Sequence, residues 1–128
     1  MRLLLDTHTF LWWLSGSERL SVPARHAISN ETNEILVSAA SAWEITTKHR
    51  LGKLSGSDLI AQDVPSGIAG QGFTELGITV QDASRAGSLA APLRDPFDRM
   101  LIAQALIHDL VLVSNETVFD RYGVRRLW

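Results

Sequence analysis

Cysteine is absent from the 128-residue sequence. Its absence excludes disulfide bonds, thiolate nucleophiles and cysteine-ligated zinc, and is consistent with a reducing compartment. Long apolar runs are missing too. The run at residues 3–5 ends at Asp6, which makes it too short for the core of a signal peptide, and no other run approaches the length of a membrane span. We therefore expect a cytoplasmic protein that does not associate with a membrane.

A surplus of basic residues is also lacking. The sequence has 12 Lys and Arg against 14 Asp and Glu, which gives a net charge of −2. Nucleic-acid binding rests on positive charge, so any such contact must come from a local patch. The apolar fraction of 45% and the length are typical of one globular domain, residues 1–128, with a single core.

Short apolar runs alternate with helical patterns along the chain. The expected strands lie at residues 2–5, 34–37, 73–78, 110–113 and 124–128. The expected helices lie at residues 9–14, 20–30, 81–89 and 96–109, with another from Ser38 or Ser41 to about Arg50, a weak helix within 55–72 and a helical turn at 116–121. This alternation predicts a three-layer α/β/α sandwich with a mostly parallel central sheet. Such sheets bind ligands beyond the carboxyl ends of their strands, near a switch in strand order.

The helix that follows Asp95 carries a second acid in an unusual place. Asp95 is expected to cap this helix, and Pro96 suits its first position because proline has no N–H to leave unpaired. Asp98 falls at the head of a stripe that the helix should bury, whose other members are Leu101, Ile102 and Ala105. Asp98 either only complements the helix dipole or acts together with other acids.

Three further acids follow expected strands. Asp6 follows the first strand directly, Glu44 lies in the first turns after the second, and Glu116 follows the fourth. Each also has a local explanation: Asp6 as a helix cap, Glu44 in a capping box with Ser41 or an ion pair with Lys48, and Glu116 as a first-turn acid. Crowded carboxylates repel one another unless a cation is present, so four at one sheet edge favour a hard ion such as Mg²⁺ or Mn²⁺.

Several stretches of the sequence resemble proteins of the PIN-domain family. They are Leu-Leu-Leu-Asp-Thr-His at residues 3–8, Ser-Ala-Trp-Glu-Ile with Lys48 and Leu-Gly-Lys-Leu within residues 41–54, and Asp-Pro-Phe-Asp-Arg at residues 95–99. The Ser-Asn-Glu stretch at residues 114–116, before residues 119–123, also matches the C-terminal pattern of that family. The resemblance covers essentially the whole chain and is greatest to the VapC-type ribonuclease toxins of bacterial toxin–antitoxin pairs.

This resemblance implies a Mg²⁺- or Mn²⁺-dependent endoribonuclease that hydrolyses RNA, forms a homodimer and is blocked by a cognate antitoxin protein. By position, Asp6, Glu44 and Asp98 match the core acids of the family. Asp6 and Asp98 would bind the metal, and Glu44 would bind it directly or through water. Glu116 stands where relatives often have Asp, as a fourth catalytic acid. Water would be the nucleophile, leaving a 5′-phosphate and a 3′-hydroxyl.

Two basic residues are candidates for contacts with RNA phosphates. Lys48 follows Glu44 by one helical turn, and Arg99 follows Asp98 directly, where it could instead pair with Asp98 or Glu44. Two alternative functions stay open at this point. One is a catalytically silent PIN-like scaffold that binds RNA or protein, and the other is a housekeeping RNA-processing nuclease.

Overall fold

The computed structural model describes residues 1–90 and 92–128. Within them, parallel strands form a single sheet in the order β3-β2-β1-β4-β5. The strands are β1 (Arg2–Leu5), β2 (Glu34–Ser38), β3 (Thr74–Leu76), β4 (Val111–Val113) and β5 (Arg125–Leu127). Leu4 in the central strand pairs with Leu36 on one side and Leu112 on the other. The predicted parallel sheet is confirmed.

The helices lie close to their expected positions. They are α1 (Thr7–Ser15), α2 (Val22–Ser29), α3 (Ala39–Arg50), α4 (Asp58–Gln62), α5 (Val64–Gly70), α6 (Val80–Ser88), α7 (Pro96–Ile107) and the 3-10 helix η1 (Thr117–Tyr122). The expectation of one weak helix within residues 55–72 is wrong, because α4 and α5 are separate there. Asp63 lies between them and caps α5 by accepting a hydrogen bond from the Ser66 N–H.

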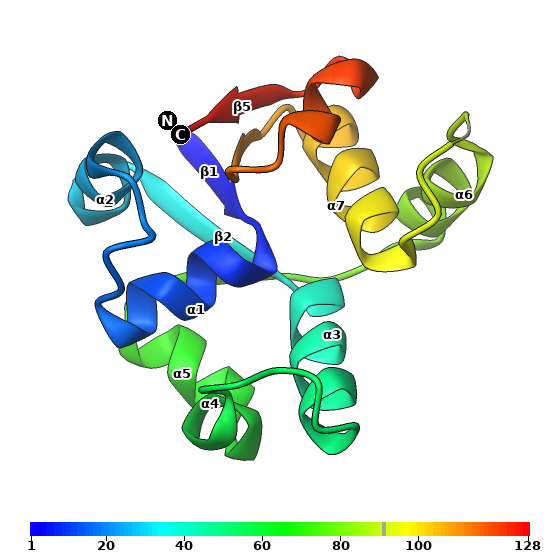
Figure 1. Cartoon of the computed structure of the whole chain (residues 1–128). Helices are drawn as coiled ribbons and strands as arrows, with labels where there is room; N and C mark the ends of the chain where they lie inside the picture. Colours follow the sequence, from blue (N-terminus) through cyan, green and yellow to red (C-terminus); the bar gives the residue numbers. More distant parts are fainter. Residues whose placement is uncertain (91) are drawn as a thin grey trace.

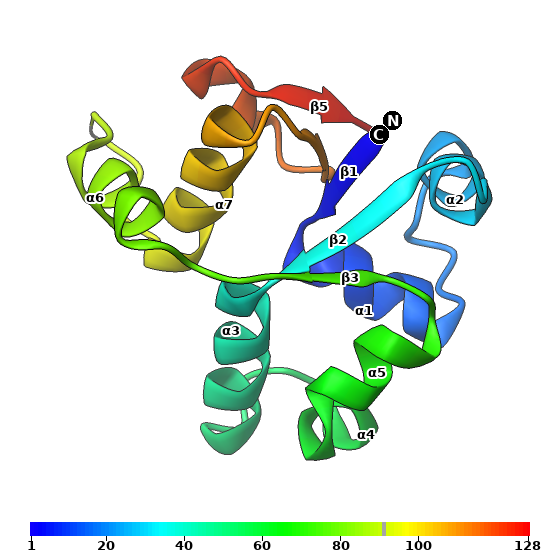
Figure 2. The ribbon, with the colours of Figure 1, turned by 180° about the vertical axis from the view of Figure 1, so that it is seen from behind.

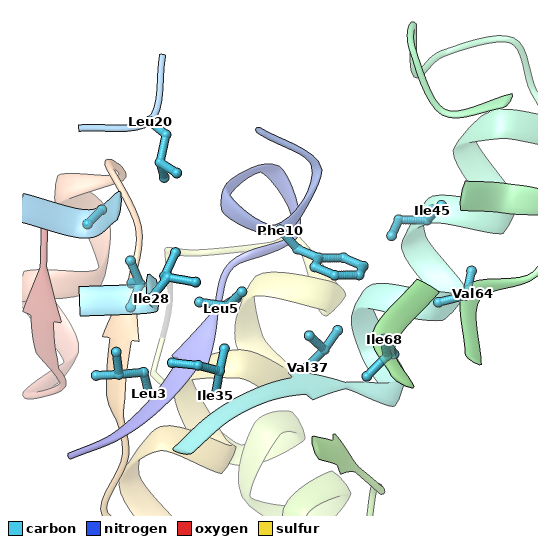
Figure 3. Close-up of a cluster of buried hydrophobic side chains, with 12 residues drawn as sticks. Leu3, Leu5, Phe10, Leu20, Ile28, Ile35, Val37, Ile45, Val64 and Ile68 are labelled. Carbon is cyan, nitrogen blue, oxygen red and sulfur yellow. The ribbon is translucent and has the colours of Figure 1, made fainter. Parts of the chain in front are cut away.

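Helices cover both faces of the sheet, as the α/β/α prediction requires. Figures 1 and 2 show α1, α2, α4 and α5 on one side and α6 and α7 on the other. Neighbouring residues of β1 point to opposite faces. Leu3 and Leu5 therefore join the apolar cluster drawn in Figure 3, which includes Phe10 of α1, whereas Leu4 packs in a second cluster with Leu101 of α7.

The order of the strands creates a switch point at the end of β1. From β1 the chain moves outward to β2 and β3, and then returns to the other side of β1 as β4. Asp6 follows β1 and Ser114 follows β4, so both lie at the edge where such sheets bind ligands. Among the described residues, no helix is long and apolar enough to cross a membrane.

Candidate active site

Asp98 is held at the start of α7 by a well-formed cap. The Asp95 Oδ1 atom accepts hydrogen bonds from the backbone N–H groups of Phe97, at 2.9 Å, and Asp98, at 3.2 Å. The predicted stripe is confirmed, because Leu101, Ile102 and Ala105 are all buried. This packing fixes the first turn of α7 and leaves Asp98 half-buried at its head.

The charges of the other three predicted acids act on Asp98. Burial, followed by the negative charges of Asp95, Asp6, Glu44 and Glu116, raises the pKa of Asp98 from 3.8 to about 8. The structure thus brings Asp6, Glu44 and Glu116 close enough to Asp98 to act on its charge. It also adds the capping residue Asp95, which the sequence did not single out for this cluster.

Asp6 is buried and does not act as a helix cap. It occupies the N-cap position of α1, but its side chain accepts no capping hydrogen bond. Its Oδ2 atom instead accepts a hydrogen bond from the Ser114 hydroxyl at 2.7 Å. Burial raises the pKa of Asp6 and outweighs the lowering effects of Ser114 and His8. The local explanation as a cap is therefore wrong, and Asp6 is a buried carboxylate at the switch point.

Glu44 is buried in α3 and paired with Lys48. Ser38 caps this helix by accepting a hydrogen bond from the Ala40 N–H at 3.0 Å, so the predicted capping box with Ser41 is wrong. The alternative is confirmed, because Lys48 Nζ donates a hydrogen bond to Glu44 Oε2. Ser41 instead accepts a hydrogen bond from the Thr7 hydroxyl at 2.9 Å. That bond links α3 to the start of α1, directly after Asp6.

Lys48 is the cation of the site. Burial lowers its pKa, but the hydrogen bond and charge of Glu44, together with the charges of Asp95 and Asp98, outweigh burial and raise it. Its Nζ lies 6.0 Å from the centre of the Phe97 ring. Lys48 therefore stays protonated at neutral pH and carries a positive charge beside Glu44, Asp95 and Asp98.

Glu116 lies on the rim of the cluster. It is exposed at the N-cap position of η1, where its side chain makes no capping bond. Its backbone N–H donates to the Ser114 Oγ atom at 3.0 Å. Ser114 therefore holds the Asp6 carboxylate and the backbone of Glu116 at once. In the sequence, the signal for this link is the position of Ser114, a small hydroxyl residue between the fourth expected strand and Glu116.

Arg99 turns away from the acids to the backbone. Its Nε donates to Ala86 O at 2.9 Å and its Nη1 to Leu93 O at 2.7 Å, while its Nη2 donates to the carbonyls of Gly87 and Leu89. Four of its five N–H donors thus serve main-chain carbonyls. The ion pairs found among the described residues include none of Arg99 with Asp98 or Glu44, which corrects that alternative, whereas its contact with RNA stays a prediction. Arg99 binds the backbone of residues 86, 87, 89 and 93.

The donor set fits a hard divalent cation held by few protein ligands. Among the described residues, no three acidic or histidine side chains stand close enough together to form a complete metal site. Glu44 is engaged by Lys48, whereas the hydrogen bonds found in this part of the chain include none to the Asp98 carboxylate. Mg²⁺ keeps several waters and takes one or two carboxylates, so a pair such as Asp6 and Asp98 would be enough to hold it.

The comparisons with known proteins agree on one family. The family model of the PIN domain matches residues 3–125. Ribonuclease VapC22 of Mycobacterium tuberculosis is 32% identical over 118 residues, which cover 88% of this chain and 85% of the relative.

Two solved structures resemble the fold over nearly its whole length. DNA-bound VapBC from Salmonella typhimurium matches with a TM-score of 0.70 at 20% identity, covering 98% of this chain and 96% of that one. VapBC2 from Rickettsia felis, bound to a promoter DNA fragment, matches with a TM-score of 0.68 at 13% identity, covering 98% and 97%. Identities this low support the fold alone. The family model and the curated relative each cover most of the chain, and the chain therefore belongs to the PIN domain family.

Proposed function

We propose that this chain is a divalent-metal-dependent endoribonuclease that acts as the toxin of a toxin–antitoxin pair. The observation that carries the proposal is the crowding of Asp6, Glu44 and Glu116 around Asp98, whose pKa rises to about 8. A carboxylate cluster at the switch point of a parallel sheet is a site for a cation and a phosphate. The relative that is 32% identical is named a ribonuclease, which supports RNA as the substrate.

Asp6 and Asp98 would hold a Mg²⁺ or Mn²⁺ ion, and Glu44 would join them directly or through water. A bound ion of this kind lowers the pKa of a coordinated water and neutralises charge on the phosphate. Burial and the neighbouring negative charges raise the pKa of Asp98, and the positive charge of a bound cation would favour its ionised form. Asp6 and Asp98 would then supply negative charge that offsets the charge of the cation.

The remaining residues of the site orient the RNA. Lys48 lies beside the acids and would contact a phosphate next to the scissile bond. The attacking water loses a proton as its oxygen bonds to phosphorus and the bond from phosphorus to the 3′ oxygen breaks. The 3′ oxygen takes up a proton, which leaves a 5′-phosphate and a 3′-hydroxyl. Exposed single-stranded RNA is the expected substrate, because its bases and backbone can be spread along a protein surface.

Two proteins are the proposed partners of the chain in the cytoplasm. The similar solved structures from Salmonella typhimurium and Rickettsia felis are VapBC assemblies, which supports a cognate antitoxin as one partner. The other is a second copy of the chain in a homodimer. Co-purification with the product of an adjacent small gene tests the antitoxin, and light scattering of the purified chain tests the dimer.

The first experiment compares cleavage of a panel of single-stranded and structured RNAs by the wild-type chain and by Asp98→Asn. Each protein is assayed with Mg²⁺, with Mn²⁺ and with EDTA. We expect the wild type to cut in both metals and not in EDTA, and Asp98→Asn to lose at least about 100-fold in rate, since it replaces a metal ligand. Glu31→Gln removes an exposed carboxylate from the loop before β2 and should cut like the wild type.

Two results would contradict the proposal. Equal cutting by the wild type and Asp98→Asn would place the activity outside this site or in a contaminant. No cutting of any RNA in either metal would favour the catalytically silent scaffold.

A further inference from the structure

Gln104 is a polar side chain in the middle of α7 with no exposed surface. Its Oε1 accepts a hydrogen bond from the Ser38 hydroxyl at 2.6 Å. Its Nε2 donates to Gly77 O at 3.1 Å and to Asp82 Oδ2 at 3.1 Å. A buried amide with these partners is held in one orientation, because turning it would leave several polar groups unpaired.

Ser38, the partner of Gln104, is the N-cap residue directly before α3. Ser38 ends β2 and caps α3, and the same hydroxyl that donates to Gln104 accepts from the Ala40 N–H. Glu44 lies about 9 Å farther along α3, and Asp98 lies about 9 Å back along α7 from Gln104. The Ser38–Gln104 hydrogen bond therefore joins the two helices that carry these acids, at a point inside the core.

Two other buried hydrogen bonds join the remaining acid-bearing segments. The Thr7 hydroxyl donates to Ser41 at 2.9 Å, which ties the start of α1 to α3. The Ser114 hydroxyl donates to Asp6 at 2.7 Å, which ties the end of β1 to the end of β4. Together with Ser38 and Gln104, these pairs connect every segment that brings an acid to the cluster. The Gln104 amide supplies the link to α7.

We propose that Gln104 is a positioning residue of this site, which acts through Ser38 to set the place of Glu44 relative to Asp98. The inference rests on the proposed function, because it concerns the spacing of the proposed metal-binding acids. Residues that support metal ligands typically contribute 10–100-fold in affinity or activity, and a displacement of about 1 Å at a reacting centre costs about 100-fold in rate. An apolar residue of similar length would fill the same space without the link.

The test uses Gln104→Met and Ser38→Ala, which break the link from its two ends. The control is Ser21→Ala, because Ser21 caps α2 by accepting from the Ala24 N–H at 3.2 Å, on the face of the sheet opposite α7. We measure kcat and KM on a single-stranded RNA, the Mn²⁺ dissociation constant by calorimetry and the melting temperature. Both test variants should lose about 10–100-fold in kcat and bind Mn²⁺ more weakly. Their KM for RNA should change by less than about threefold.

A merely structural role gives a different result. It would lower the melting temperature of Gln104→Met while kcat and Mn²⁺ affinity stay at wild-type values, as expected for Ser21→Ala, and that result overturns the inference. If Gln104→Met does not fold, Ser38→Ala decides in the same way. A wild type that binds Mn²⁺ but cuts no RNA contradicts the proposed nuclease function, and the Mn²⁺ affinities of the variants still decide the inference. A wild type that neither binds nor cuts overturns both.

Discussion

Asp98 is placed where a carboxylate weakens the fold. It is half-buried and faces the charges of four other acids, and its pKa rises to about 8. A carboxyl group with a raised pKa binds a proton more tightly in the folded chain than in the unfolded chain. The stability that this proton provides is present at low pH and is lost as the pH rises through about 8. Such a residue is typical of a site in which function outweighs stability.

Asp98→Asn should therefore stabilise the metal-free protein. In EDTA at pH 9 we expect its melting temperature to exceed that of the wild type by about 2–4 °C, and the gain should shrink at pH 6, where Asp98 is already neutral. Adding Mg²⁺ should stabilise the wild type and leave Asp98→Asn nearly unchanged. Thermal unfolding at both pH values, with Glu31→Gln as the exposed-carboxylate control, checks this. A variant less stable than the wild type at pH 9 would show that Asp98 is not strained by its neighbours.

Lys48 and Arg99 differ in what their charges do, although both follow an acid of the site. Lys48→Met should weaken RNA binding in EDTA and reduce the salt dependence of log Kd by about 0.7, as for the loss of one phosphate contact on a single strand.

Arg99→Lys keeps the charge but loses the guanidinium fork that donates to four carbonyls. It should therefore lower the free energy of unfolding by about 2 kcal/mol and leave the salt dependence of log Kd unchanged. Anisotropy titrations at several salt concentrations and thermal unfolding separate the two. A reduced salt slope in Arg99→Met, which removes the charge, would place Arg99 on the RNA-binding surface.

At the scale of elements, buried polar contacts join α6 to α7. Its buried residues are Asp82 and Ala86. Asp82 forms a capping box with Thr79, accepts a hydrogen bond from Gln104 and lies 3.1 Å from the His108 ring nitrogen. Burial raises the pKa of Asp82, but these hydrogen bonds together outweigh it and lower the pKa below 3.8. The charged form of Asp82 therefore holds α6 against α7.

Asp82→Asn should destabilise the protein in a way that depends on pH. At pH 7 the loss should be about 2 kcal/mol, the typical contribution of hydrogen bonds to a buried charge. Because the pKa of Asp82 is lowered by folding, its contribution is present above 3.8 and disappears as the pH falls through its folded-state pKa. The difference in the free energy of unfolding between the wild type and Asp82→Asn, measured in urea, should therefore become smaller from pH 5 towards pH 3. A gap that stays constant over this range would mean that the Asp82 charge does not support α6.

Elements with a local signal could be predicted from the sequence, and contacts between distant segments could not. The N-cap residues Ser21 and Asp95 predict the starts of α2 and α7, because a capping side chain binds backbone N–H groups two or three positions away. The local explanations of Asp6 failed because its partner Ser114 comes from the far end of the chain. The hydrogen bonds of Arg99 could not be predicted for a related reason, because a backbone carbonyl that binds a distant side chain leaves no signal in the sequence.

At the scale of the whole molecule, β1 belongs to both halves of the core. Leu3 and Leu5 pack with α1, α2 and α5 on one face, and Leu4 packs with α7 and η1 on the other. All three side chains have no exposed surface. Because both clusters pack on this strand, we infer that residues 1–128 unfold as one domain.

The aromatic residues allow each layer to be followed separately during unfolding. Trp12, Trp13 and Trp128 pack against the first cluster, and Tyr122, the single tyrosine, packs against the second. In a Trp43→Phe background, which removes the exposed fourth tryptophan, tryptophan fluorescence and the NMR signal of fluorotyrosine should give the same urea midpoint. Leu4 lies in the second cluster, against which Tyr122 packs, and Leu4→Ala should lower the free energy of unfolding by about 3 kcal/mol. It should nevertheless shift both midpoints equally, because both clusters pack on β1. A shift of the tyrosine midpoint alone would mean that the two layers unfold independently.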